Sequence, residues 1–387
     1  MELTEEGAGP FSLSAEQRAI REMTRSFAAE NVAPFALGWD REQHFPLDVI
    51  RRTAPLGFGG ICCTEEAGGS GLGRLEAVLI FEALAAACPG FSSFISIHNM
   101  AAWMVDTFGN EACRERFLPR LTSMEWLASY CLTEPGSGSD AAALRTRAVK
   151  SGGDYVLTGV KQFISGAGAS DIYVVMARTG EEGAKGISAF LVPADTPGLS
   201  FGPLEKKMGW RMQPTRQVIL EDCRVPAENL LGGEGEGFRI AMAGLDGGRL
   251  NIAACSLGGA QAAHEKALAY AGERAAFGQP LNRFQALQFK LADMETNLAA
   301  ARTLLYTAAA RLDAGAPDAT KWSAMAKRFV TDACFEVANQ ALQLHGGYGY
   351  LHDYGLEKLV RDLRVHQILE GTNEIMRVII ARHLVGR

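Results

Sequence analysis

The carboxylate of Glu370 has neighbours that do not fit a solvated helix face. It follows Ile368 and Leu369 and precedes Gly371, at the junction of two expected helices. In an apolar pocket, desolvation disfavours the charged form of a carboxylate and raises its pKa, which suits a general base. The same stretch also fits a carboxylate that ends one helix while Thr372 caps the next. These residues alone leave both interpretations open.

Several glycine-rich loops could bind a ligand. Residues 130–140 read YCLTEPGSGSD, and such a loop can place N–H and O–H donors around a phosphate or a polar ring edge. Most loops of this composition simply turn the chain. Gly346 and Gly347 either end a helix or let a phosphate approach the backbone closely. Phe163, at the end of an expected strand, could cover a planar cofactor or fill a core.

Other chemistries lack their usual patterns. No histidine lies in HExxH or in a Glu-x-x-His pair, so the sequence predicts no metal site. A G-x-S-x-G elbow is missing, which argues against acyl transfer by a serine nucleophile. Neither G-x-G-x-x-G nor a Walker motif occurs, so a Rossmann site and a P-loop are not indicated.

Composition limits the class of protein. The chain has 387 residues, 48% of them hydrophobic, and a net charge of −6, which argues against a nucleic-acid partner. No apolar run reaches the ~18 residues of a membrane span. Residues 1–6 are acidic and resemble neither a signal nor a transit peptide, and the eight cysteines include no CxxC pair. We expect a soluble protein, cytoplasmic if bacterial, or mitochondrial-matrix if the chain is a mature eukaryotic one.

The order of expected elements indicates an α+β fold. Helical patterns fill 14–124, beginning with a capping box at Ser14 and Gln17. Short β-rich runs follow, separated by Gly, Pro and Asp, which is typical of an antiparallel sheet or barrel. Long helices then return. We expect an N-terminal helical domain (1–128), a middle antiparallel β domain (129–237) and a C-terminal four-helix bundle (238–387). The expected helices of the last domain are 249–277, 284–312, 318–344, 356–369 and 373–384.

Taken together and in order, these motifs resemble the acyl-CoA dehydrogenase family. The loop 130–140 is similar to one family signature, and 343–349 running on to 370–372 is similar to another. The resemblance covers residues 13–384. It implies a homotetramer of three-domain subunits that bind FAD between the β domain and the C-terminal bundle, with the cofactor reaching a neighbouring subunit.

The resemblance also implies which residues would bind the cofactor and the CoA. Phe163 and Ser165 match positions where many relatives have Trp and Thr, so an aromatic ring and a hydroxyl are kept. The residues expected at FAD within the same subunit are Tyr130, Leu132, Thr133, Phe163, Ser165 and Thr372. Those expected at the FAD of the adjacent subunit are Arg274, Phe277, Gln285, Gln343, Gly346 and Gly347. Those expected at the acyl-CoA are Ser139, Asp246, Arg249, Leu369 and Gly371, with Ser139 touching either FAD or the pantetheine.

By the same resemblance, Glu370 is the base that removes the α-hydrogen while the β-hydrogen leaves as hydride to flavin N5. The thioester oxygen would be held by the Glu370 backbone N–H and a ribityl hydroxyl, an oxyanion-hole arrangement. Some relatives carry the base just before the arginine that matches Arg249. That position is Gly248 here, which cannot serve.

The substrate is less constrained. Segments 96–104, 209–216 and 364–371 resemble most closely the members of the family that act on isobutyryl-CoA. Leu369 stands where straight-chain relatives often have Tyr, and its different shape could make room for an α-methyl branch. Since one methylene changes binding by only ~1–3 kcal/mol, 2-methylbutyryl- and butyryl-CoA stay open as substrates. We expect electron-transfer flavoprotein as the electron acceptor; an acyl-CoA oxidase and, from another class, a non-catalytic helical scaffold are the alternatives.

Overall fold

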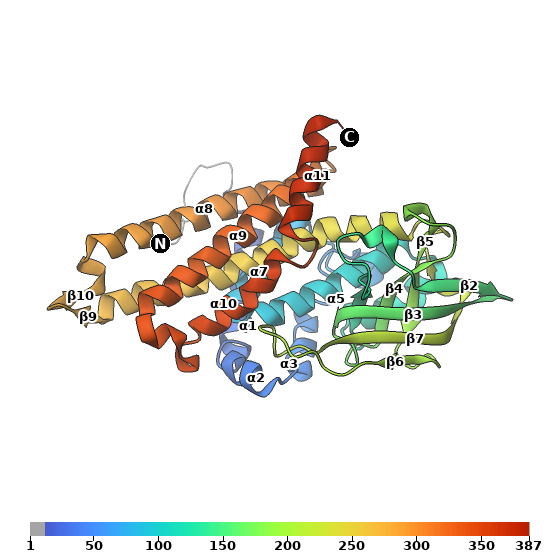
Figure 1. Cartoon of the computed structure of the whole chain (residues 1–387), viewed down its shortest axis with the longest axis horizontal. Helices are drawn as coiled ribbons and strands as arrows, with labels where there is room; N and C mark the ends of the chain where they lie inside the picture. Colours follow the sequence, from blue (N-terminus) through green and yellow to red (C-terminus); the bar gives the residue numbers. More distant parts are fainter. Residues whose placement is uncertain (1–11, 387) are drawn as a thin grey trace.

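A sheet occupies one end of the molecule and helices form the rest (Figure 1). The computed structural model describes residues 12–386, so the expectation about the acidic stretch 1–6 lies outside the described residues. The α+β architecture is confirmed, with helices before and after a β-rich middle segment. Among the described helices, none combines the length and the apolar character needed to cross a bilayer.

The N-terminal helices begin as their capping pattern predicts. The Ser14 hydroxyl accepts a hydrogen bond from the Gln17 backbone N–H at 3.1 Å. The Gln17 side-chain oxygen accepts one from the Ser14 backbone N–H at 2.9 Å. Pro89 opens the most buried helix of this part, where its missing N–H costs nothing. The helices are α1 (Ala15–Asn31), α2 (Ala36–Glu42), α3 (Leu47–Arg51), α4 (Arg74–Ala87), α5 (Pro89–Phe108) and α6 (Glu111–Thr122).

The sheet of the middle segment is mixed, although we expected an antiparallel one. Most neighbours are antiparallel, but β1 runs parallel to β4, and β2 meets β4 in parallel at Arg147 and Arg178. The sequence did not reveal β1, because Ala-Ser-Tyr-Cys lacks the β-branched residues that mark strands. The strands are β1 (Ala128–Cys131), β2 (Arg147–Ser151), β3 (Asp154–Ser165), β4 (Ile172–Arg178), β5 (Ile187–Pro193), β6 (Leu199–Phe201), β7 (Thr215–Pro226) and β8 (Leu230–Leu231).

Long helices form the C-terminal part. They are α7 (Gly237–Glu273), α8 (Gln285–Asp313), α9 (Ala319–His345), α10 (Leu356–Arg364) and α11 (Asn373–Val385). The core helix is α7, which packs against α4, α5, α8 and α9. Its residues from Leu250 to Ala260 are all buried, as their small and apolar character predicts.

Three expected helix boundaries were wrong. The long helix begins at Gly237 rather than at 249, because glycines that weaken a helix pattern here permit close packing. A β-carbon at Gly244, for example, would lie 1.9 Å from the methyl carbon of Met104 in α5. Its end is Glu273 rather than 277, since Arg274 starts a hairpin of β9 (Ala275–Ala276) and β10 (Gln279–Pro280). Likewise α10 ends at Arg364 rather than at 369, and a 3-10 turn (Val365–Gln367) leads to Glu370.

Candidate active site

Glu370 lies in a sharp turn between α10 and α11. Its backbone is left-handed (φ +57°), and so is that of Gly371 (φ +87°). A non-glycine residue in this conformation is costly and persists only where its surroundings impose it. Thr372 ends the turn by accepting from the Ile375 N–H at 3.4 Å, so it caps α11. The capping interpretation of this stretch is therefore correct, and it does not exclude a chemical role for Glu370.

The Glu370 side chain is half-buried, and one of its carboxylate oxygens is cut off from solvent. Its Oε2 atom is buried and has no hydrogen-bond partner among the described residues. Burial raises the pKa of Glu370 to about 7, while the positive charges of Arg249 and Lys327 oppose this rise. A carboxyl group with a pKa near neutrality can take up and release a proton at the pH of most cells.

Arg249, which is 3% exposed, fixes the turn from the side of α7. Its Nε donates to the Glu370 carbonyl oxygen at 3.3 Å, and its Nη1 donates to Asp246 at 2.6 Å. The other Asp246 oxygen accepts from the Thr320 hydroxyl at 2.6 Å. Arg249 therefore lies beside Glu370, and through Asp246 it links α7 to the start of α9.

Lys327 of α9 also contacts this turn, and no motif in the sequence predicted its role there. Its buried ammonium donates to the Gly371 carbonyl oxygen at 2.7 Å and to the Asn373 side chain at 2.9 Å. Burial lowers the pKa of Lys327 to about 8, and the Glu370 charge opposes this change. The available signal was a lysine in the buried stripe of α9, between Ser323 and Val330.

Tyr130, at the end of β1, contributes a second unpartnered polar group. Its hydroxyl is buried and makes no hydrogen bond within residues 12–386. Burial raises the Tyr130 pKa well above its usual value, and the negative charge of Glu370 adds to this effect. The end of β1 and the turn before α11 are therefore close enough for the charge of Glu370 to act on Tyr130. Both present polar atoms for which only a ligand or water could provide a partner.

A buried ion pair holds the loop that follows β1. Lys161 of β3 contacts Glu134 at 2.7 Å and also donates to the Leu132 carbonyl oxygen at 3.2 Å. Glu134 accepts two further bonds, from the N–H groups of Arg145 and Thr146. No local pattern in the sequence indicates that Glu134 and Lys161 form a pair. Their contacts give the glycine-rich loop a fixed shape.

The end of β3 lies beside this loop. The Gln162 N–H donates to the Thr133 carbonyl oxygen at 2.8 Å, so Thr133 and Phe163 come from neighbouring backbones. Phe163 is 64% exposed and has a left-handed backbone (φ +60°), an unusual state for a large apolar side chain. An uncovered ring next to a rigid loop with an unpartnered Tyr130 hydroxyl fits a flat cofactor with a polar edge. Ser139 lies exposed on the same loop, while Leu132 is buried and Ser165 and Leu369 are half-buried.

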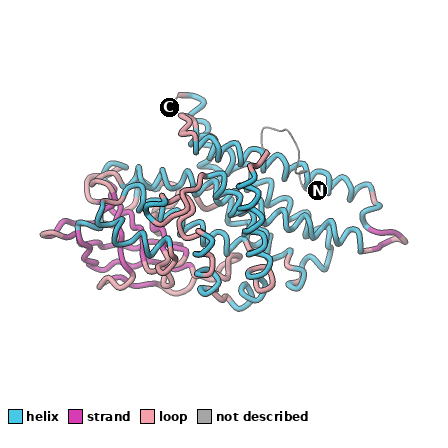
Figure 2. The backbone as a smooth tube through the Cα atoms, turned by 180° about the vertical axis from the view of Figure 1, so that it is seen from behind, coloured by secondary structure: helices cyan, strands magenta, loops and turns pink. Residues whose placement is uncertain are grey.

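The remaining cofactor candidates gather at the opposite end of the molecule. A shallow cavity of about 390 Å³ there is lined by Tyr270, Arg274, Gln343, Gly346, Gly347 and Tyr348, among others. Phe277, at the tip of the β9–β10 hairpin, is 97% exposed, and Gln285 is exposed at the start of α8. Figures 1 and 2 show this hairpin at the end of the bundle that points away from the sheet. One chain therefore does not bring the two groups of candidates together.

A buried network connects the turn with the middle segment. His366 accepts from the Trp210 indole N–H at 3.2 Å, so its other ring nitrogen carries the proton and donates to Ser256 at 2.6 Å. Burial lowers the pKa of His366 to about 3, which keeps the ring neutral. The backbone N–H of Trp210 donates to Asp362 of α10 at 2.6 Å. These contacts attach the segment before β7 to the chain just ahead of Glu370.

The described residues include no cluster of His, Cys, Asp and Glu that could bind a metal ion. The acyl-CoA dehydrogenase family models match the chain almost throughout: the N-terminal domain at 14–125, the middle domain at 129–223 and the C-terminal domain at 235–385. The chain therefore belongs to the acyl-CoA dehydrogenase family.

Individual relatives narrow the likeness further. The chain is 57% identical to mitochondrial isobutyryl-CoA dehydrogenase of Dictyostelium discoideum over 96% of this chain and 90% of that protein. It is 54% identical to the bovine (Bos taurus) enzyme of the same name, over 97% and 90%. Among solved structures, butyryl-CoA dehydrogenase from Megasphaera elsdenii is 38% identical and superposes with a TM-score of 0.95, covering 97% of this chain and all of that one.

Proposed function

We propose that the chain oxidises the α,β-bond of a short branched acyl-CoA, converting isobutyryl-CoA to methacrylyl-CoA with Glu370 as the base. The observation that carries this proposal is the buried carboxylate of Glu370, whose Oε2 has no partner in the described part of the chain. Relatives at 57% and 54% identity carry the name isobutyryl-CoA dehydrogenase, which supports the choice of acyl group.

In this mechanism the protein positions the acyl-CoA and accepts a proton from it. Glu370, with a pKa of about 7, takes the α-proton of the acyl group, and the carboxylate's isolation from water strengthens its basicity. The Glu370 backbone N–H stabilises the thioester oxygen as charge develops there. Gly371 lies next to that N–H at the acyl end. Arg249 and Asp246, already paired at 2.6 Å, bind the CoA moiety near the mouth of the site.

FAD, when bound, supplies the hydride acceptor. We propose that Tyr130, Leu132, Thr133, Phe163, Ser165 and Thr372 hold its ring system in the subunit that carries the reacting Glu370. The unpartnered Tyr130 hydroxyl and the exposed ring of Phe163 support this assignment. Electrons then leave to electron-transfer flavoprotein; an oxidase would instead pass them to oxygen and release peroxide.

The cofactor site is completed by a second copy of the chain in a homotetramer. Arg274, Phe277, Gln285, Gln343, Gly346 and Gly347 of one copy hold the pyrophosphate and adenosine end of a neighbour's FAD. Support comes from the position of the β9–β10 hairpin at the end away from the sheet (Figure 2) and from the exposure of the Phe277 ring. The projecting helix α11 adds exposed apolar residues, including Val378 and Leu384, that a neighbour could cover (Figure 1).

Two measurements test these proposals. The Glu370→Gln variant should bind FAD and stay yellow but lose nearly all flavin reduction by acyl-CoA, while Glu374→Gln, an exposed neighbour, should reduce normally. Retained bleaching in Glu370→Gln would contradict the assignment of the base. The rates of flavin reduction by isobutyryl-, 2-methylbutyryl-, isovaleryl- and butyryl-CoA then test the acyl group. A clear preference for butyryl-CoA, the substrate named for a structural relative, would contradict the branched-chain assignment.

A further inference from the structure

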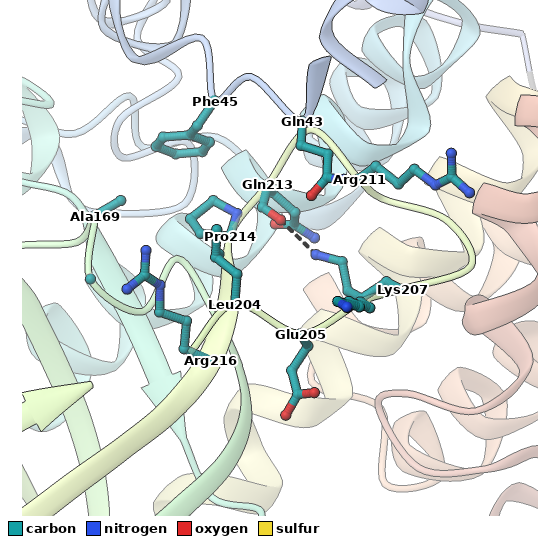
Figure 3. A pocket seen from close by; sticks show the side chains of 12 residues that line it. Gln43, Phe45, Ala169, Leu204, Glu205, Lys207, Arg211, Gln213, Pro214 and Arg216 are labelled. Atoms are coloured by element: carbon teal, nitrogen blue, oxygen red, sulfur yellow. Dashed lines mark hydrogen bonds between the residues drawn. The ribbon is translucent and has the colours of Figure 1, made fainter. Parts of the chain in front are cut away.

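A second cavity lies between the N-terminal helices and the sheet, and Glu370 is not among its lining residues. Its volume is about 620 Å³, within the ~300–1,000 Å³ typical of small-molecule sites. Its wall comes from the α2–α3 connection, the turn after β3, and the segment that leads into β7 (Figure 3). Its lining includes Phe45 and Gln213 as well as several charged side chains. None of them belongs to the proposed catalytic or cofactor residues.

The cavity has a surplus of positive charge. Lys206, Lys207, Arg211 and Arg216 line it, against the single carboxylate of Glu205. Within residues 12–386 the structure records no salt bridge for any of these four cations. Lys207 donates to two neutral acceptors, the Gln213 carbonyl oxygen and the Thr215 hydroxyl. Glu205 is already engaged by the Gln162 amide at 2.8 Å.

Gln213 is the polar group that most needs a ligand. Its side chain is 1% exposed, yet both its Oε1 and its Nε2 lack hydrogen-bond partners among the described residues. The Nε atom of Arg216 is buried and unpartnered as well. Burying such groups without partners is costly, so a protein usually provides a partner, an ordered water or a ligand.

The arrangement also indicates the shape of the ligand. In Figure 3, Arg216 and Arg211 lie on opposite sides of Lys207 and Gln213, and the Phe45 ring stands at the edge of the cavity. Cations on two sides fit an extended anion, and guanidinium groups bind phosphate oxygens particularly well. The unpartnered atoms of Gln213 are too deeply buried for a flat protein surface to reach, which favours a small molecule.

We propose that this cavity binds a phosphate-bearing small molecule of about nucleotide size, held by Arg211, Lys207 and Arg216 and hydrogen-bonded by the amide of Gln213. The aromatic ring of Phe45 can cover a flat group of the ligand. Its lining shares no residue with the proposed catalytic and cofactor residues, and the proposal does not depend on the activity of the enzyme.

Calorimetric titration of the FAD-saturated protein tests the site. The probes are pyrophosphate and ADP, titrated without acyl-CoA and at constant ionic strength. We expect one saturable site per chain, with affinity lowered about tenfold or more in Arg216→Gln and Arg211→Gln, the loss expected for a charge-assisted hydrogen bond. Gln213→Leu should also weaken binding. It removes two unpartnered polar atoms without changing the volume greatly, so it should fold.

The control is Arg147→Gln, which removes an exposed arginine on β2 outside the cavity. It should bind both probes like the unmodified protein. The proposal is wrong if neither probe binds saturably, if binding is unchanged in the cavity variants, or if Arg147→Gln loses as much affinity. It is also wrong if the cavity variants alter only the affinity for a protein electron acceptor, because the cavity would then be part of a docking surface.

Discussion

A β-carbon added to Gly248 would lie 2.5 Å from the Oε2 atom of Glu370. The same β-carbon would lie 3.1 Å from the sulfur of Met100, so α7, α5 and the Glu370 turn meet at this point. The absence of a side chain at 248 therefore does more than remove an alternative position for the base. It creates the space in which the carboxylate of Glu370 lies.

Gly248→Ala should therefore displace the carboxylate and slow catalysis. We expect flavin reduction to fall by at least about tenfold, since small misplacements of a reacting group are costly. Stopped-flow reduction by isobutyryl-CoA measures the effect. Gly272→Ala is the matched control, because it lies on the exposed end of the same helix, where the nearest side-chain atom is 3.6 Å from an added β-carbon. It should leave the rate unchanged and stabilise the helix slightly. Equal rates in both variants would refute the steric argument.

The raised pKa of Glu370 predicts two pH effects. Because the base must be deprotonated, kcat/KM should fall below about pH 7 as Glu370 takes up a proton. The pKa of Glu370 is higher in the folded protein than in the unfolded chain. At a pH between these two pKa values, the native state therefore holds a proton on Glu370 that the unfolded chain has lost. Its contribution to stability is therefore complete at low pH and is lost as the pH rises through about 7.

Glu370→Gln isolates the second effect. The variant should be more stable than the unmodified protein at pH 8, by on the order of 2–3 kcal/mol, and the difference should shrink toward pH 5. Urea unfolding of the FAD-bound proteins at both values measures it. A stability difference that does not depend on pH would show that the carboxylate is not held in an unfavourable charged state.

Lys327 should set the proton affinity of Glu370 as well as its position. Lys327→Met removes a cation that lowers the pKa of Glu370, so the acid limb of the kcat/KM profile should move up by about one unit. It also breaks the bond to the Gly371 carbonyl, so kcat should fall. Lys321→Met, on the same helix but paired with Asp318 near the surface, is the control. Lower activity without any shift of the acid limb would mean that Lys327 acts through packing alone.

The sequence was most informative where chemistry and local pattern coincide. The capping box at Ser14, the buried stripe of α7 and the α+β order all follow from spacing and residue type. The family match confirmed the resemblance that the loop 130–140 and the Glu370 turn had indicated. The left-handed state of Glu370 could not be predicted, because Gly371 indicates only that the chain turns here, while long-range contacts from Arg249 and Lys327 impose the conformation of Glu370 itself.

The parts that the sequence could not provide depend on residues distant in the chain. Glu134 and Lys161 are 27 residues apart, and Trp210 and His366 are 156 residues apart. No local periodicity links such partners. The same reason explains the missed strand β1, whose pairing with β4 depends on tertiary context rather than on its own residues.

The distance between the two groups of cofactor residues predicts complementation between copies. Within one chain, the charge of Glu370 acts on Tyr130 of β1, whereas Arg274 directly precedes the β9–β10 hairpin, at the end of the bundle away from the sheet (Figure 1). If a neighbour's Arg274 completes the site, Arg274→Ala should weaken FAD binding by about tenfold, although it is remote from Glu370 in its own chain. Glu370→Gln should bind FAD but not reduce it.

Co-expression of the two variants should then restore part of the activity. In a mixed oligomer, the intact Glu370 of one copy meets the intact Arg274 of the other, so one type of site contains both residues. We expect the separately purified variants to have little activity at limiting FAD, and the mixed oligomers, isolated through two different affinity tags, to recover a clear fraction of it. If the FAD site were formed within one chain, every site in the mixture would carry one defect. Mixed oligomers without recovered activity would therefore contradict the shared site.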